Sequence, residues 1–212
     1  SFNQQELVRG IREAGNKALL IGCSDAGEIT NEGPTQKSVG VMAIRSDAIS
    51  FYTGLGKEIK QGAREAGQAV SREVKEKADK PLRAFIMLPD VLTGNGADIV
   101  RGVLDVLGPH FAVVGGAAGD DFMFEKTYQY REDEVVSGAV AGVGLAGKFT
   151  IGIGVRHGWV PIGLPMKVTK AQGAVLYELA QLHNLRALLI GVPDRPDTTG
   201  ITHKHPGDIQ QV

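Results

Sequence analysis

The residue best suited to covalent chemistry is the single cysteine, Cys23, which follows an apolar run and lies in the segment GCSDAG at 22–27. A thiol can act as a nucleophile when a neighbouring base lowers its pKa. A nucleophile elbow needs the pattern G-x-S-x-G, but Ala26 occupies the last position. We therefore interpret Cys23 as a small residue at a strand end and expect no catalytic residue. A cysteine-dependent hydrolase or transferase, with a histidine from elsewhere in the fold, is the alternative.

A second loop of similar composition, GGAAGDD at residues 115–121, also follows an apolar run. Glycines can adopt positive φ and turn backbone N–H groups toward a ligand, and Asp120 can accept hydrogen bonds from an amine. An aspartate-capped turn is the alternative. Because clefts at strand ends commonly bind ligands, we predict that the two loops and the segment HGW at 157–159 line one pocket. The predicted ligand-binding residues are Cys23, Ser24, Gly27, Gly115, Gly116, Gly119, Asp120, His157 and Trp159.

The five histidines do not form a recognisable metal motif, since neither H-E-x-x-H nor C-x-x-C occurs. We therefore expect no structural metal site. A haem group, however, can be held by one axial histidine in an apolar pocket. His157 is the candidate axial ligand, and the sequence identifies no other cofactor.

Residues 142–148, GVGLAGK, match part of a phosphate-binding loop. That motif needs Ser or Thr after the lysine, and this chain has Phe149. It also needs a helix to begin there, whereas the following FTIGIGV has a strand pattern. We predict a glycine-rich hairpin at this position and no nucleotide site.

Composition narrows the class of protein. The net charge of −1 provides no excess positive charge to bind nucleic acid or an anionic membrane. No apolar run approaches the ~20 residues of a membrane span, and no signal peptide is visible. One cysteine fits a reducing compartment. We expect a cytoplasmic protein.

Hydrophobic periodicity predicts a mixed α/β (α+β) fold, with layered mixed sheets and helices packed outside. Helical spacing occurs at 3–14, 59–78 and 97–107. Strand patterns alternate with these helices at 18–22, 39–44, 49–53, 82–88 and 111–114. A run of strand patterns, expected to form a β-meander, follows at 127–131, 135–145, 149–155, 166–170 and 175–179, with one more at 186–192.

Five segments, in this order and spacing, resemble FIST N-terminal domains. They are GCSDAGEI at 22–29, LPDVL at 88–92, VVGGAAGD at 113–120, HGWVP at 157–161 and VTKAQGAVLYEL at 168–179. The resemblance covers roughly residues 17–180. It implies an intracellular sensory domain of signal transduction that binds a small ligand, such as an amino acid or related metabolite. It also implies a signalling partner such as a histidine kinase or cyclase.

The same resemblance leaves other functions open. Some FIST members resemble haem-based nitric oxide sensors, and a eukaryotic branch recruits substrates for F-box proteins. The tail departs from the family pattern, because residues 180–183 run directly into LRALLIGVPD, which resembles the start of a FIST C-terminal region. We therefore predict a sensory domain at 1–182 and a partial C-terminal segment at 183–212. The sequence does not indicate the oligomeric state.

Overall fold

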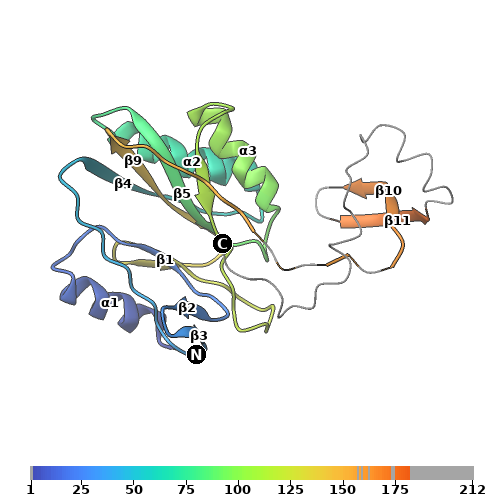
Figure 1. Ribbon diagram of the computed structural model, residues 1–212, viewed down its shortest axis with the longest axis horizontal. Helices are drawn as coiled ribbons and strands as arrows, with labels where there is room; N and C mark the ends of the chain where they lie inside the picture. Colours follow the sequence, from blue (N-terminus) through green and yellow to red (C-terminus); the bar gives the residue numbers. More distant parts are fainter. Residues whose placement is uncertain (1, 157, 159, 162, 173–174, 182–212) are drawn as a thin grey trace, which may run out of the picture. The chain divides into compact units, whose positions relative to one another are not determined.

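The computed structural model describes residues 2–156, 158, 160–161, 163–172 and 175–181 (Figure 1). In this part of the chain, three helices and eleven strands in several sheets confirm the predicted mixed α+β class. The chain divides into two compact units at Ile153, and each is described by itself. The predicted domain boundary at 182 and the predicted strand at 186–192 lie outside the described residues.

A four-stranded sheet forms the centre of the first unit. Its strand order is β4 (Ile49–Gly56), β9 (Val140–Gly147), β5 (Leu82–Pro89) and β6 (Val113–Gly115). β9 is antiparallel to both of its neighbours, whereas β5 and β6 are parallel and are joined through helix α3 (Gly96–Leu107). A strand from the later half of the chain thus lies between two strands of the earlier half, so both halves build one sheet.

Helix α2 (Ala63–Lys77) packs against β4 and β9, and α3 packs against α2 (Figure 1). The apolar stripe predicted for residues 59–78, which include α2, is buried at Val70 and Val74. Close approach depends on glycine, because a Cβ built at Gly142 would lie 2.4 Å from the Phe85 ring and one at Gly144 would lie 2.4 Å from Val74. The segment 142–148 is therefore not the predicted hairpin. Its glycines let α2 pack closely, and no helix begins among the described residues that follow this segment.

The opposite face of this sheet packs on a second, three-stranded sheet. That sheet has the antiparallel order β1 (Ile21–Cys23), β7 (Gln129–Arg131) and β8 (Glu134–Val136). Leu55 and Ala141 of the central sheet form a buried cluster against Ile21 and Val136. Two sheets thus enclose a core between them, and this arrangement fixes the position of β1.

Helix α1 (Gln4–Ala14) contacts the three-stranded sheet at β8. Its first turn is capped by Asn3, whose side chain accepts a hydrogen bond from the Glu6 N–H at 3.3 Å. At its other end the buried Arg12 pairs with Glu132 at 3.0 Å and with Asp133 at 3.2 Å, in the turn between β7 and β8. The hairpin of β2 (Glu28–Thr30) and β3 (Gly33–Thr35) follows β1.

Two predicted strands, at 39–44 and 149–155, are wrong. The pattern is strand-like, but strands exist only where backbone groups find a partner. β4 pairs with β9 instead, and the Ser46 hydroxyl accepts the N–H groups of Ala48 and Ile49, both at 3.1 Å. Residues 39–44 remain outside any sheet, with Val41 63% exposed.

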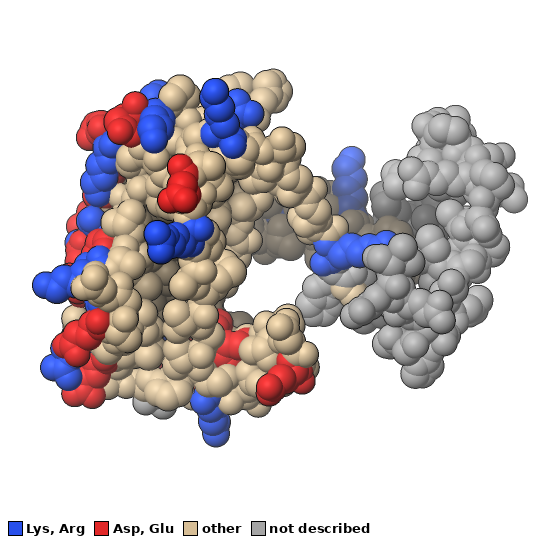
Figure 2. Space-filling view, turned by 60° about the vertical axis from the view of Figure 1, so that its left-hand side comes forward, with Lys and Arg blue, Asp and Glu red and all other residues tan. Residues whose placement is uncertain are grey.

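The second unit contains the antiparallel hairpin of β10 (Met166–Gln172) and β11 (Val175–Gln181), as predicted at 166–170 and 175–179. Each described helix is too short or too polar to cross a bilayer. On the face of the molecule in Figure 2, acidic and basic side chains are interspersed among uncharged ones. That face carries no basic field of the kind that binds nucleic acid.

Candidate functional site

The two glycine-containing loops meet, as the sequence predicts. The Ser24 hydroxyl donates to the Gly119 carbonyl at 2.7 Å, and the Gly119 N–H donates to the Ser24 carbonyl at 2.9 Å. The same hydroxyl accepts the Tyr128 N–H at 2.9 Å. A Cβ at Gly119 would lie 2.9 Å from the Ala26 nitrogen, so glycine is required for this approach. Ser24 therefore joins β1 to two segments about one hundred residues later.

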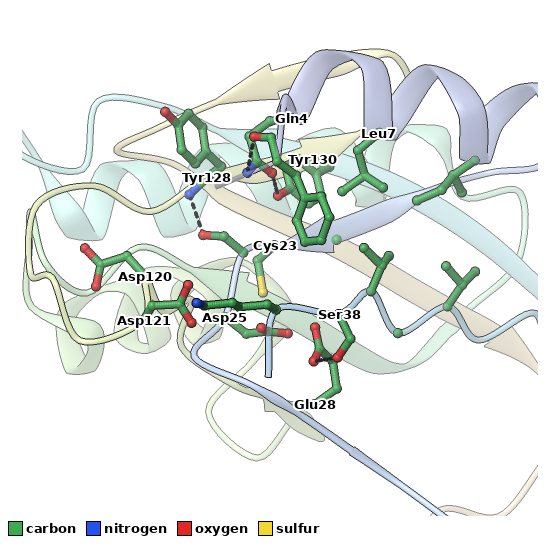
Figure 3. Close-up of a pocket in the computed structure, with 18 of the residues that line it drawn as sticks. Gln4, Leu7, Cys23, Asp25, Glu28, Ser38, Asp120, Asp121, Tyr128 and Tyr130 are labelled. Carbon is green, nitrogen blue, oxygen red and sulfur yellow. Dashed lines mark hydrogen bonds between the residues drawn. The ribbon is translucent and has the colours of Figure 1, made fainter. Parts of the chain in front are cut away.

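A cavity of about 670 Å³ opens beside this junction (Figure 3). Its walls come from the start of α1, from β1 and β7, and from the irregular segments 37–42 and 120–128. The volume falls in the range of about 300–1,000 Å³ that is typical of small-molecule sites. Apolar side chains such as Leu7, Ile11 and Val41 share the lining with polar ones.

Cys23 lies in the cavity wall with its sulfur directed inward (Figure 3). Burial, and to a lesser extent the negative charge of Asp25, raise the pKa of the thiol to about 11. The thiol is therefore protonated near neutral pH, whereas a cysteine nucleophile needs a depressed pKa. Among the described residues, no histidine lines the cavity to act as its base.

Tyr130 and Asp25 border the same space as Cys23. Burial raises the pKa of Tyr130 to about 12, with smaller contributions from Cys23 and Asp25. The Tyr130 hydroxyl donates to the Gln4 side chain. Its ring lies against Gly22, where a Cβ would approach ring carbon Cδ2 to 2.7 Å. Gly22 thus makes room for the aromatic wall.

The pKa of Asp25 is raised as well. Burial is the largest cause, the hydrogen bond from the Gly27 N–H acts to lower the pKa, and the charges of Glu28 and Asp121 act to raise it. The cavity lining holds five carboxylates and two lysines, namely Asp25, Glu28, Asp120, Asp121 and Glu125 against Lys37 and Lys126. At neutral pH this balance favours a ligand with a positively charged group.

Glu28 links the β2–β3 hairpin to the irregular segment 37–42. Its carboxylate accepts hydrogen bonds from the hydroxyls of Thr35, at 3.3 Å, and Ser38. The two hydroxyls are themselves 2.8 Å apart. This cluster tethers the beginning of the segment that forms the outer wall of the cavity.

Asp120 organises its own loop. Burial acts to raise its pKa, but the N–H groups of Glu125, Phe124 and Lys126, at 2.7, 3.0 and 3.1 Å, bring the pKa below its usual value. These bonds use three of the roughly four acceptor positions of a carboxylate. They hold a loop in which Asp121, Phe122 and Phe124 all have positive φ. Asp120 thus shapes the cavity wall.

The predicted ligand-binding residues fall into three groups. Cys23, Ser24 and Asp120 line the cavity. The four predicted glycines do not line it. Gly27 lies against the Thr35 carbonyl, and Gly115 pairs with Met87 in the central sheet. Gly119 joins the two loops, and Gly116 is exposed. His157 and Trp159 lie outside the described residues.

Among the described residues the one histidine is the exposed His110, and His157, the candidate axial ligand, lies outside them. No group of three or more His, Cys, Asp or Glu side chains in the described part of the chain is placed to hold a metal ion. The cavity-lining residues that sequence reasoning missed include Tyr128, Tyr130, Glu28 and Ser38. Alternation within 127–131 places Tyr128 and Tyr130 on one face, but only the pairing of β7 with β1 brings that face to Cys23.

Comparison with known proteins gives a family match over most of the chain. The model of the FIST N domain matches residues 1–181. Uncharacterized protein MJ1623 of Methanocaldococcus jannaschii is 29% identical over 166 residues, 76% of this chain and 32% of that protein. Two Mycobacterium tuberculosis proteins, uncharacterized proteins MT0656 and Rv0628c, are each 27% identical over 199 residues, 91% of this chain and 49% of theirs. The chain thus spans a third to a half of the length of these curated relatives.

Proposed function

Because this chain belongs to the FIST N domain family, whose members are generally sensory domains of signal transduction, we propose that it senses a small ligand. The ligand occupies the cavity beside Cys23, and its binding is reported to a signalling protein such as a histidine kinase or cyclase. An amino acid or related metabolite fits the proposal.

The observation that carries this proposal is the cavity itself. Its volume of about 670 Å³ suits a small molecule, and its lining combines apolar side chains with charges of both signs. The ammonium group of an amino acid would be bound near Asp25, and Lys37 or Lys126 would pair with the carboxylate. Tyr130 would supply an aromatic surface.

The state of Cys23 supports binding over catalysis. With its pKa raised to about 11, the thiol lacks the thiolate character that a hydrolase or transferase would use. The hydrogen bonds that join the two loops give the cavity a preformed wall, which reduces the entropy cost of binding.

A thermal shift screen with amino acids and related metabolites tests the proposal. A ligand at one hundred times its Kd stabilises a protein by about 2.7 kcal/mol, and a domain of this size gains about 2–4 °C in Tm per kcal/mol, so we expect a rise of about 5–11 °C. Asp25→Asn should reduce that rise for an amine ligand. The matched control is Glu76→Gln, which removes one exposed charge from α2. A screen without a stabilising compound, or an equal response in both variants, contradicts the proposal.

A further inference from the structure

We propose that the cavity is also a strand-addition site, in which an extended peptide carrying basic side chains pairs with the free edge of β1. This inference rests on the proposed function only in that both assign binding to the same cavity. It differs in the class of ligand, because the peptide is recognised by its backbone as well as by its side chains.

The hydrogen bonds around β1 show which backbone groups are free. The Leu20 carbonyl accepts the Glu132 N–H at 3.0 Å, and the Ser24 N–H donates to the Tyr128 carbonyl at 2.9 Å. Backbone direction alternates along a strand, so Gly22 also faces β7. Ile21 and Cys23 therefore direct their N–H and carbonyl groups away from β7. β1 is an edge strand of its sheet, and it lines the cavity.

The opposite wall also has an unpaired backbone. Residues 39–42 line the cavity, and no backbone hydrogen bond joins residues 39–45 to another described residue. Their sequence, VGVMAIR, has the pattern of a strand, yet these residues belong to no strand. In Figure 3, Ser38, which precedes this segment, lies below Cys23 of β1, and both side chains line the cavity. An added strand would give both walls the partner that they lack.

Another edge strand of the same fold, β4, shows how such an edge is closed. β4 is likewise an edge strand, but side chains of α2 occupy its free backbone groups. Lys77 donates to the Thr53 carbonyl at 2.9 Å, and the Leu55 N–H donates to Glu73 at 2.8 Å. Such capping blocks unwanted strand pairing. β1 has no equivalent cap among the described residues.

Charge selects the kind of peptide. The cavity lining contains five carboxylates and two lysines, so an incoming strand with Lys or Arg side chains complements it. Apolar side chains on the same peptide would meet Leu7, Ile11 and Val41. An alternating apolar and basic sequence satisfies both requirements.

The probe is the fluorescein-labelled pentapeptide Val-Lys-Val-Lys-Val, with blocked ends, titrated against the full chain by fluorescence anisotropy. We expect saturable binding that weakens about tenfold or more when both lysines become glutamates. Two further peptides carry N-methyl groups on alternate backbone nitrogens, one peptide at the odd-numbered residues and the other at the even-numbered residues. At least one of them should bind about tenfold more weakly, because N-methylation removes hydrogen-bond donors and leaves the side chains unchanged. The inference is overturned if the lysine peptide does not bind, or if both N-methylated peptides bind as tightly as the lysine peptide.

Amide hydrogen exchange locates the bound peptide on the unaltered protein. Exchange at Cys23 and Ile21 should slow on peptide addition, whereas Gly22, already facing β7, provides an internal control. Protection of Cys23 and Ile21 in the free protein would mean that the chain itself fills the edge, and this result also overturns the inference. If metabolites raise the Tm but peptides do not bind, only the strand-addition site fails. If peptides bind and no metabolite does, only the small-ligand proposal fails.

Discussion

Removal of the Ser24 hydroxyl tests whether one side chain holds the cavity wall together. In Ser24→Ala, the Gly119 carbonyl loses the donor at 2.7 Å and the Tyr128 N–H loses the acceptor at 2.9 Å. Each such hydrogen bond contributes about 0.5–1.5 kcal/mol, so the variant should lose about 1–3 kcal/mol of unfolding free energy. At about 2–4 °C per kcal/mol, Tm should fall by about 2–12 °C.

Ser71→Ala is the matched control, because it deletes a hydroxyl that also donates to a carbonyl at 2.7 Å, that of Gly67. Ser71 lies inside α2, where that carbonyl already accepts a helical backbone bond. Its removal leaves no polar group unpaired, so we expect little change in Tm.

Urea and thermal unfolding followed by circular dichroism measure both variants. Amide exchange at Tyr128 should accelerate in Ser24→Ala and remain unchanged in Ser71→Ala. Equal losses of stability in the two variants would refute the reasoning, because they would show that unpaired backbone groups at the loop junction carry no cost. Unchanged exchange at Tyr128 would refute it as well.

Two further predictions concern the cavity wall. Because the folded pKa of Cys23 is raised to about 11 from 9.0, the stability due to its neutral thiol is complete below pH 9 and is lost as pH rises toward 11. The rate of iodoacetamide labelling should increase over the same pH interval. A labelling rate with its midpoint at or below pH 9 would contradict the burial of the thiol. Gly22→Val should displace the Tyr130 ring, which a Cβ would approach to 2.7 Å, and lower the unfolding free energy by about 1–3 kcal/mol. Added to Gly22→Val, Tyr130→Ala should cost less than it does alone in a double-mutant cycle, and strict additivity would exclude the clash.

The helices and the class of fold could be predicted from sequence because their determinants are local. A stripe of apolar residues at helical spacing marks α2, and Asn95 at the start of α3 accepts the Ala97 N–H at 2.9 Å. The meeting of the two loops was also foreseeable, since both follow short apolar strands. The roles of their glycines were not, because a glycine needed for ligand contact and one needed for loop contact look alike in sequence.

Strand partners were decided by tertiary structure alone. β9 pairs with β4 from Ile49–Gly147 to Gly56–Val140, across more than eighty intervening residues at each step. Residues 39–44 and 149–155 have equally strand-like patterns and remain unpaired. Alternation reports which side chains share a face, but pairing also requires an available edge, which depends on the whole chain.

The chemistry of the site divides in the same way. The sequence by itself determined that a lone cysteine, a serine and an aspartate follow short strands, and that glycine lets these loops come close. Only the folded chain decided that the half-buried Cys23 lies beside Asp25 and Tyr130 and so keeps its proton. It also decided that the Asp120 carboxylate binds its own loop. The physical reason is that a pKa and a hydrogen-bond partner depend on neighbours in space, which the order of residues does not specify.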